Sequence, residues 1–148
     1  MISARTSGPS WLAAGIASLV AMGAACSSAS PASGATFPAD AYTTTPSDSG
    51  ALVIDVRTSP QPPSRGTNDV QLTVTRASDG TPVDGVSLDV QPWMPAMGHG
   101  SSTPTVTAQG GGVYLVTEVY FYMPGAWELR TSISGATTDH ATLQLTIQ

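Results

Sequence analysis

The chain has 148 residues and a formal net charge of −5, and its length suits one domain with short appendages. Only 10% of the residues are charged, against about 25% in an average soluble protein, and the five basic residues are scattered arginines, which argues against nucleic-acid binding. One cysteine excludes an intrachain disulfide and a thiolate metal cluster, and with only two histidines the composition disfavours an enzyme.

Residues 1–25 have the pattern of a bacterial export signal. Arg5 precedes an apolar run over residues 11–25, which is shorter than the roughly 20 residues that a membrane-spanning helix needs. The small residues that end this run and the following Cys26 resemble a lipobox, in which the cysteine becomes the first residue of the mature protein and carries a lipid. The alternative is ordinary signal cleavage near Ala25, with Cys26 a bystander. Both interpretations predict export to the periplasm or cell surface, and the first adds a lipid anchor on a bacterial membrane.

Residues 26–50 are predicted to be a disordered tether. Serine, threonine, alanine, proline and glycine dominate this stretch, and it has no apolar period. Too little hydrophobic area is present to offset the entropy lost on ordering. A lipidated Cys26 would need such a spacer to hold a domain away from the membrane, but the same composition suits any disordered N-terminal segment.

Residues 51–148 are predicted to form one all-β domain. Apolar residues alternate with polar ones in several short runs separated by turn signals, and no helical period is sustained. This pattern indicates an immunoglobulin-like β-sandwich of about seven strands without a disulfide, whose core would hold Trp127 and a Tyr or Phe of residues 113–122. The predicted inward rows are Leu52, Ile54 and Val56; Val70, Leu72 and Val74; Val86, Leu88 and Val90; Trp127, Leu129, Thr131 and Ile133; and Ala141, Leu143, Leu145 and Ile147.

The segment 93–100 departs from the strand pattern and holds three candidate metal ligands. Met94, Met97 and His99 fall within six residues, and thioether sulfur and imidazole both suit copper, the thioether favouring Cu(I). On a strand, Met94 and Met97 would point to opposite faces, so we expect an irregular loop to bring the three side chains together. Met123, after the next long run, is a candidate fourth ligand; solvent or a partner protein would serve as well.

These methionines also have a purely structural interpretation. Methionine fills irregular gaps in hydrophobic cores, so Met94 and Met97 would then plug one open end of the sandwich, and Met123 would belong to the core. A separate alternative is a protein-interaction module on the cell surface, in which methionine, tryptophan and tyrosine side chains near this segment form a compact apolar contact patch. An enzyme is the least favoured class, because no acid–base pair, nucleophile–histidine arrangement or phosphate-binding loop is visible.

The chain contains four motifs in this order: Asp79-Gly80-Thr81-Pro82-Val83, Met94-Pro95-Ala96-Met97-Gly98-His99, Gly112-Val113-Tyr114 and Met123-Pro124-Gly125-Ala126-Trp127-Glu128-Leu129. Together these motifs resemble YtkA-like domains, which are small exported β-sandwich domains related in pattern to FixH. The resemblance implies that Met94, Met97 and His99 are copper ligands, with Met123 a weaker fourth. It also implies copper-handling or cytochrome-oxidase-assembly proteins as partners, although FixH-type proteins keep a transmembrane helix where this chain would use a lipid.

The sequence therefore predicts an exported copper-binding or copper-delivery module, with Cu(I) as the candidate cofactor and no catalytic activity. It would contact the membrane through a lipid anchor only and would not bind nucleic acid. A metal-free interaction sandwich is the alternative.

Overall fold

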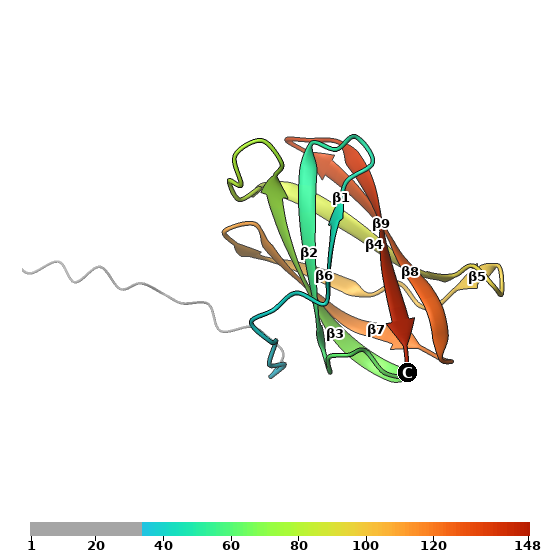
Figure 1. Ribbon diagram of the computed structural model, residues 1–148. Helices are drawn as coiled ribbons and strands as arrows, with labels where there is room; N and C mark the ends of the chain where they lie inside the picture. The colour runs from blue at the N-terminus through green and yellow to red at the C-terminus, as the bar shows by residue number, and fades with distance from the viewer. Residues whose placement is uncertain (1–33) are drawn as a thin grey trace, which may run out of the picture.

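The computed structural model describes residues 34–148, which form two antiparallel sheets packed face to face (Figure 1). This confirms the predicted all-β immunoglobulin-like sandwich, and the described residues contain nine strands rather than about seven. The first sheet has the order β1-β2-β3-β7-β6, and the second has the order β5-β4-β8-β9. The strands are β1 Thr43–Pro46, β2 Leu52–Ser59, β3 Gly66–Arg76, β4 Val86–Met94, β5 His99–Gly100, β6 Thr105–Gly110, β7 Val113–Phe121, β8 Gly125–Gly135 and β9 Asp139–Ile147.

The predicted export signal, Cys26 and the first part of the predicted tether lie outside the described residues. Within residues 34–148, no helix has the length and apolar character needed to cross a bilayer.

The core lies between the two sheets, and all the predicted inward rows are buried. The side chains of β2, β3, β4, β8 and β9 alternate between inward and outward faces, as a strand's period of two requires. The interior is therefore almost wholly apolar, and burial of this area is the main stabilising contribution. The largest side chains with almost no exposure are Trp127, Phe121, Leu52, Ile54, Leu72, Leu115, Leu129, Ile133 and Leu143.

Residues 43–46, which composition places in the tether, form the edge strand β1. They pair antiparallel with β2, from Thr43 opposite Val56 to Pro46 opposite Val53. Just before the strand, Tyr42 packs against the core, and its hydroxyl accepts a hydrogen bond from the Thr146 N–H on β9 (3.2 Å). One aromatic anchor and a ladder of backbone bonds thus order a segment that composition alone marks as disordered.

A β-bulge in β7 changes which of its side chains face the core. Val70 of β3 pairs with Val116, but Asn68 pairs with Val119, so β7 carries one extra residue between these pairs. Glu118 lies in this interval with a φ of 64°. Because each added residue reverses the facing of those that follow, the inward side chains after the bulge are Val119 and Phe121, while Tyr120 is 44% exposed.

A buried tyrosine hydrogen bond fixes the start of β7. The Tyr114 hydroxyl donates to the Val83 carbonyl oxygen (2.9 Å). Gly112 has a φ of 74°, and a Cβ atom there would lie 2.5 Å from the Val74 carbonyl oxygen. Its N–H donates to the Asp84 carboxylate (2.8 Å). The positive φ and the lack of space for a Cβ atom both require glycine at this turn.

Asp139 joins the beginning of β9 to the turn between β1 and β2, and thereby connects the two sheets. The Ser49 hydroxyl donates to Asp139 Oδ2 (2.5 Å), and the N–H of His140 donates to Oδ1 (2.8 Å). The hydroxyls of Ser47 and Ser49 stabilise the carboxylate and lower the pKa of Asp139 from 3.8 to about 2. The charged form is therefore favoured in the folded state.

Replacing Asp139 with asparagine should destabilise the protein in a pH-dependent way. A carboxyl whose pKa is depressed on folding stabilises the folded state above its ordinary pKa, and this contribution disappears as the pH falls toward the folded value. We expect Asp139→Asn to lower the urea midpoint at pH 5, and the gap from the wild type to narrow between pH 4 and pH 2. Asp89→Asn, which changes an exposed carboxylate on β4, is the control at pH 5. A gap that stays constant with pH would contradict this role.

Candidate functional site

The candidate metal-binding segment is a tight β-hairpin between β4 and β5. The N–H groups of Met97 and Gly98 both donate to the Met94 carbonyl oxygen, at 3.1 and 3.0 Å. Gly98 has a φ of 68°, a conformation that glycine adopts without a steric penalty. The expected irregular loop is therefore a four-residue turn, Pro95–Gly98, that returns the chain directly alongside β4.

The hairpin register brings Met94 and His99 opposite each other. They are direct partners in the β4–β5 ladder, and side chains of directly opposed residues project from the same face of a sheet. Met94 is 6% exposed and belongs to the core cluster, whereas His99 is exposed. Met97 lies in the turn, and its side chain is 52% exposed. The core-filling interpretation thus accounts for Met94 but not for Met97.

Gly125, the first residue of β8, provides the space for Met94. It has a φ of 129°, and a Cβ atom placed there would lie 3.1 Å from the Met94 methyl carbon Cε. The thioether of Met94 is thus pressed against bare backbone at the beginning of β8. Met123, two residues earlier, is partly buried and packs against the core, and its carbonyl oxygen accepts a hydrogen bond from Trp127 Nε1 (3.0 Å).

Tyr122 connects the hairpin to the aromatic core. Its ring is stacked on the imidazole of His99, with centroids 5.3 Å apart and planes inclined by 14°, and its hydroxyl oxygen lies 2.9 Å from Nδ1 of His99. Tyr122 also makes an edge contact with Trp127 (4.8 Å between centroids), which in turn contacts Phe121 edge-on (5.1 Å). The predicted packing of Trp127 with a Tyr or Phe of the long run is confirmed, and both partners are now identified.

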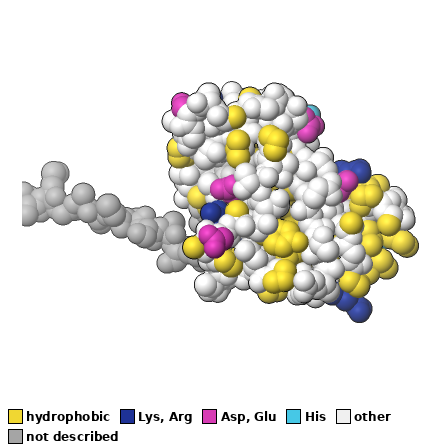
Figure 2. All heavy atoms as spheres, in the orientation of Figure 1, with side chains coloured by type: hydrophobic (Ala, Val, Ile, Leu, Met, Phe, Trp, Pro, Cys, Tyr) yellow, Lys and Arg dark blue, Asp and Glu magenta, His cyan; other side chains and the backbone are white. Residues whose placement is uncertain are grey.

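The outward side of the hairpin carries a different, charged arrangement. The Arg130 guanidinium lies 4.5 Å from the ring centroid of Trp93 and forms an ion pair with Glu128 (2.9 Å). A cation over an aromatic ring is attracted by the negative face of the ring. In Figure 2 apolar side chains gather at the projecting end of the molecule where Figure 1 places β5.

The four predicted ligands are therefore placed differently. Met94 and His99 are paired across the hairpin, Met97 is exposed in its turn, and Met123 follows Tyr122 in the segment whose residues contact the hairpin. The sequence analysis did not identify Tyr122 and Gly125 as part of this site. The motif Tyr122-Met123-Pro124-Gly125 was the available signal, because it contains both residues together with the predicted fourth ligand.

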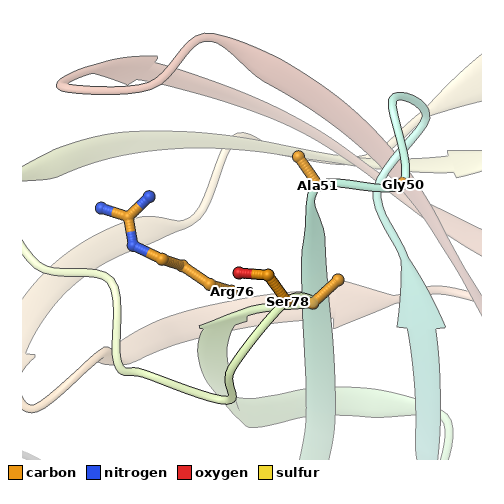
Figure 3. Close-up of a pocket in the computed structure, with 5 residues that line it drawn as sticks. Gly50, Ala51, Arg76 and Ser78 are labelled. Atoms are coloured by element: carbon orange, nitrogen blue, oxygen red, sulfur yellow. The ribbon is translucent and has the colours of Figure 1, made fainter.

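The other candidate locations have less suitable chemistry. A cavity of about 430 Å³ lies where the turn before β2 faces the end of β3, and Figure 3 shows it with Arg76 and Ser78 across from Gly50 and Ala51. These side chains offer no soft metal donor. No group of three His, Cys, Asp or Glu side chains gathers as a ligand set within residues 34–148. His140, at the beginning of β9, is exposed as its position in the strand predicts.

The comparisons with known proteins identify one related family. A family model described as YtkA-like matches residues 48–132, which extend from the turn before β2 into β8 and include the whole hairpin. No curated protein and no solved structure matches the chain.

The Gly125→Ala substitution should disturb Met94. The added Cβ atom would lie 3.1 Å from the Met94 methyl carbon Cε, which is closer than ordinary van der Waals contact. We therefore expect Gly125→Ala to lower the free energy of unfolding by about 1–3 kcal/mol more than the control variant does. The control is Gly66→Ala, at a φ of 106° with open space around the position. Urea unfolding measures the loss, and the Met94 methyl signal in a ¹³C spectrum should shift only in Gly125→Ala. Equal losses in both variants would show that backbone conformation, not contact with Met94, selects glycine.

Proposed function

The chain belongs to the YtkA-like family, and for this member we propose an exported copper-binding or copper-delivery module that holds one Cu(I) ion at the β4–β5 hairpin. The ion is its cargo, and the proposal involves no catalytic step. Met94, Met97 and His99 would be the ligands, with Met123 as a fourth.

The pairing of Met94 with His99 is the observation that carries the proposal. Directly opposed residues of an antiparallel pair have Cβ atoms about 4.5–5.5 Å apart. A thioether and an imidazole that start from such positions can both reach one ion between them. Since the hairpin register is held by backbone hydrogen bonds of Met94 with the turn, this proximity is part of the folded structure.

The chemistry of the donor set fits Cu(I) better than other biological metals. Two thioethers and one imidazole are soft to borderline ligands, which oxygen-preferring ions such as Mg²⁺ and Ca²⁺ bind poorly. Met97 is exposed, so its flexible side chain has the freedom to approach an ion held by Met94 and His99. Met123 is partly buried beside the same end of the core and would complete a four-ligand set.

The setting that we propose is the periplasm or the cell surface, with a lipid at Cys26 anchoring the domain to a bacterial membrane. Copper-handling or oxidase-assembly proteins would then exchange the ion with the hairpin. The exposed position of His99 and Met97 supports such an exchange, since a partner's ligands can approach them from solvent.

A metal-free interaction module is the second candidate. The specific observation in its favour is the projecting turn, whose residues Pro95, Ala96 and Met97 are all exposed and apolar. Capture of a partner that is equally strong with and without a Cu(I) chelator, and that Met97→Ser weakens, would support this candidate instead.

Cu(I) titration under anaerobic conditions tests the copper proposal. We expect one Cu(I) per chain in the wild type and at least a tenfold weaker affinity in His99→Gln and in Met97→Leu, because each removes one donor. Met94→Leu/Met97→Leu should abolish tight binding. Leucine conserves the volume of methionine and should keep the fold, which thermal unfolding verifies.

His140→Gln is the matched control. His140 is also exposed, but it lies at the beginning of β9, whereas the hairpin is on the side of the core where β9 ends. It should bind Cu(I) as the wild type does. Undiminished affinity in the double methionine variant would contradict copper binding at this hairpin.

A further inference from the structure

The two sheets end in four edge strands, β1, β5, β6 and β9, of which three are short or covered. β1 has four residues and ends in Pro46, and β5 has two residues. The backbone of β9 is covered from the side of β1: the Asp48 N–H donates to the His140 carbonyl oxygen (2.8 Å), and the Tyr42 hydroxyl accepts from the Thr146 N–H (3.2 Å). Short strands, prolines and covering segments are the usual means by which proteins protect a sheet edge. Within residues 34–148, β6 pairs with β7 on one side and with no strand on the other.

The neighbouring part of β4 is open on the same side of the sandwich. β5 pairs only with Trp93 and Met94, so residues 86–91 of β4 have no strand partner there among the described residues. β4 and β6 lie close to each other, although they belong to different sheets. The core is also least covered along β4: Val86 and Leu88 are 7% and 9% exposed, whereas no core residue outside β4 exceeds 3%. The side formed by β4 and β6 is therefore where the interior is closest to solvent.

This open side belongs to the longest uncharged stretch of the domain. Between Asp89 and Glu118 the sequence has no aspartate, glutamate, lysine or arginine, and the stretch includes the end of β4, the hairpin, all of β6 and the beginning of β7. The described residues as a whole hold ten acidic residues and only four arginines. Two copies of the chain therefore repel each other over most of their surfaces, and the side with β6 is where they can meet without opposed carboxylates.

We propose that a second copy of this chain covers the open side, with β6 of one copy paired antiparallel to β6 of the other about a two-fold axis. A two-fold interface places the same patch on both subunits, so an uncharged strand meets an uncharged strand. The pairing would join the first sheets of both copies into one continuous sheet and supply partners to the free backbone groups of β6. It would also shield the thinly covered core along β4. This proposal goes beyond the proposed function and needs no metal ion.

The geometry of β6 limits the registers of such a pairing. Val106 packs against the core, so Thr105 and Thr107, which are exposed, lie on the outward face of the first sheet. Opposed residues of an antiparallel pair share a face, and the register shift between Ala108 and Gly110 ends the regular ladder. In the two registers that overlap best, Thr107 lies opposite either Thr105 or Thr107 of the second copy.

Charge variants of β6 test the proposal by sedimentation equilibrium of the purified chain. The buffer is free of metal and contains a reductant, so that Cys26 cannot cross-link two copies. We expect a dimer in the wild type. Thr105→Lys/Thr107→Lys and Thr105→Glu/Thr107→Glu each oppose like charges in either register, so each should dimerise at least tenfold more weakly. An equimolar mixture of the two variants should recover the dimer, because lysines then face glutamates.

Ser134→Lys/Thr142→Lys is the matched control, since both residues are exposed on the outward face of the second sheet. It should dimerise as the wild type does, and far-UV circular dichroism verifies that every variant is folded. A wild type that stays monomeric at millimolar concentration would overturn the proposal, and so would a dimer that both β6 variants leave equally strong. Because metal is absent throughout, neither result bears on copper binding, which the Cu(I) titration decides separately.

Discussion

The contact of Trp127 with Phe121 and Tyr122 is the interaction on which the functional end of the molecule depends. Phe121 ends β7 in the first sheet and Trp127 belongs to β8 in the second, so the aromatic cluster joins the two sheets. Immunoglobulin domains often use a disulfide for this connection, which a chain with one cysteine cannot form. Aromatic rings bury large areas and prefer edge-on contacts, and here these contacts take over that role.

A second connection between the sheets lies at the opposite end. Asp139 begins β9 and binds the turn between β1 and β2, whereas Trp127 pairs with Leu145 near the end of β9. One connection is therefore electrostatic and sensitive to acid, and the other is apolar. The candidate site lies beside the aromatic cluster of Trp127. Protonation of Asp139 would therefore weaken the contact between the sheets at the end of the sandwich that is far from the hairpin.

The candidate site combines a rigid half with a free half. Met94 is buried against Gly125, and His99 rests on Tyr122, so two potential ligands are placed by the core. Met97 projects from the turn with half of its surface exposed. A site of this kind suits a module that binds an ion and passes it on, because the free ligand can leave the ion without any change in the fold.

The sequence by itself determined the all-β class, the inward rows of five strands and the presence of three soft donors within six residues, because alternation and ligand chemistry are local properties. Only the tertiary structure decided the facing of Tyr120 and Phe121, since one extra residue in β7 reverses the alternation of the side chains that follow it. It also decided that Met94 faces His99 and that Tyr122 holds the imidazole from 23 residues away. Such pairings depend on hairpin register and on packing between sheets, which a period-two pattern does not encode.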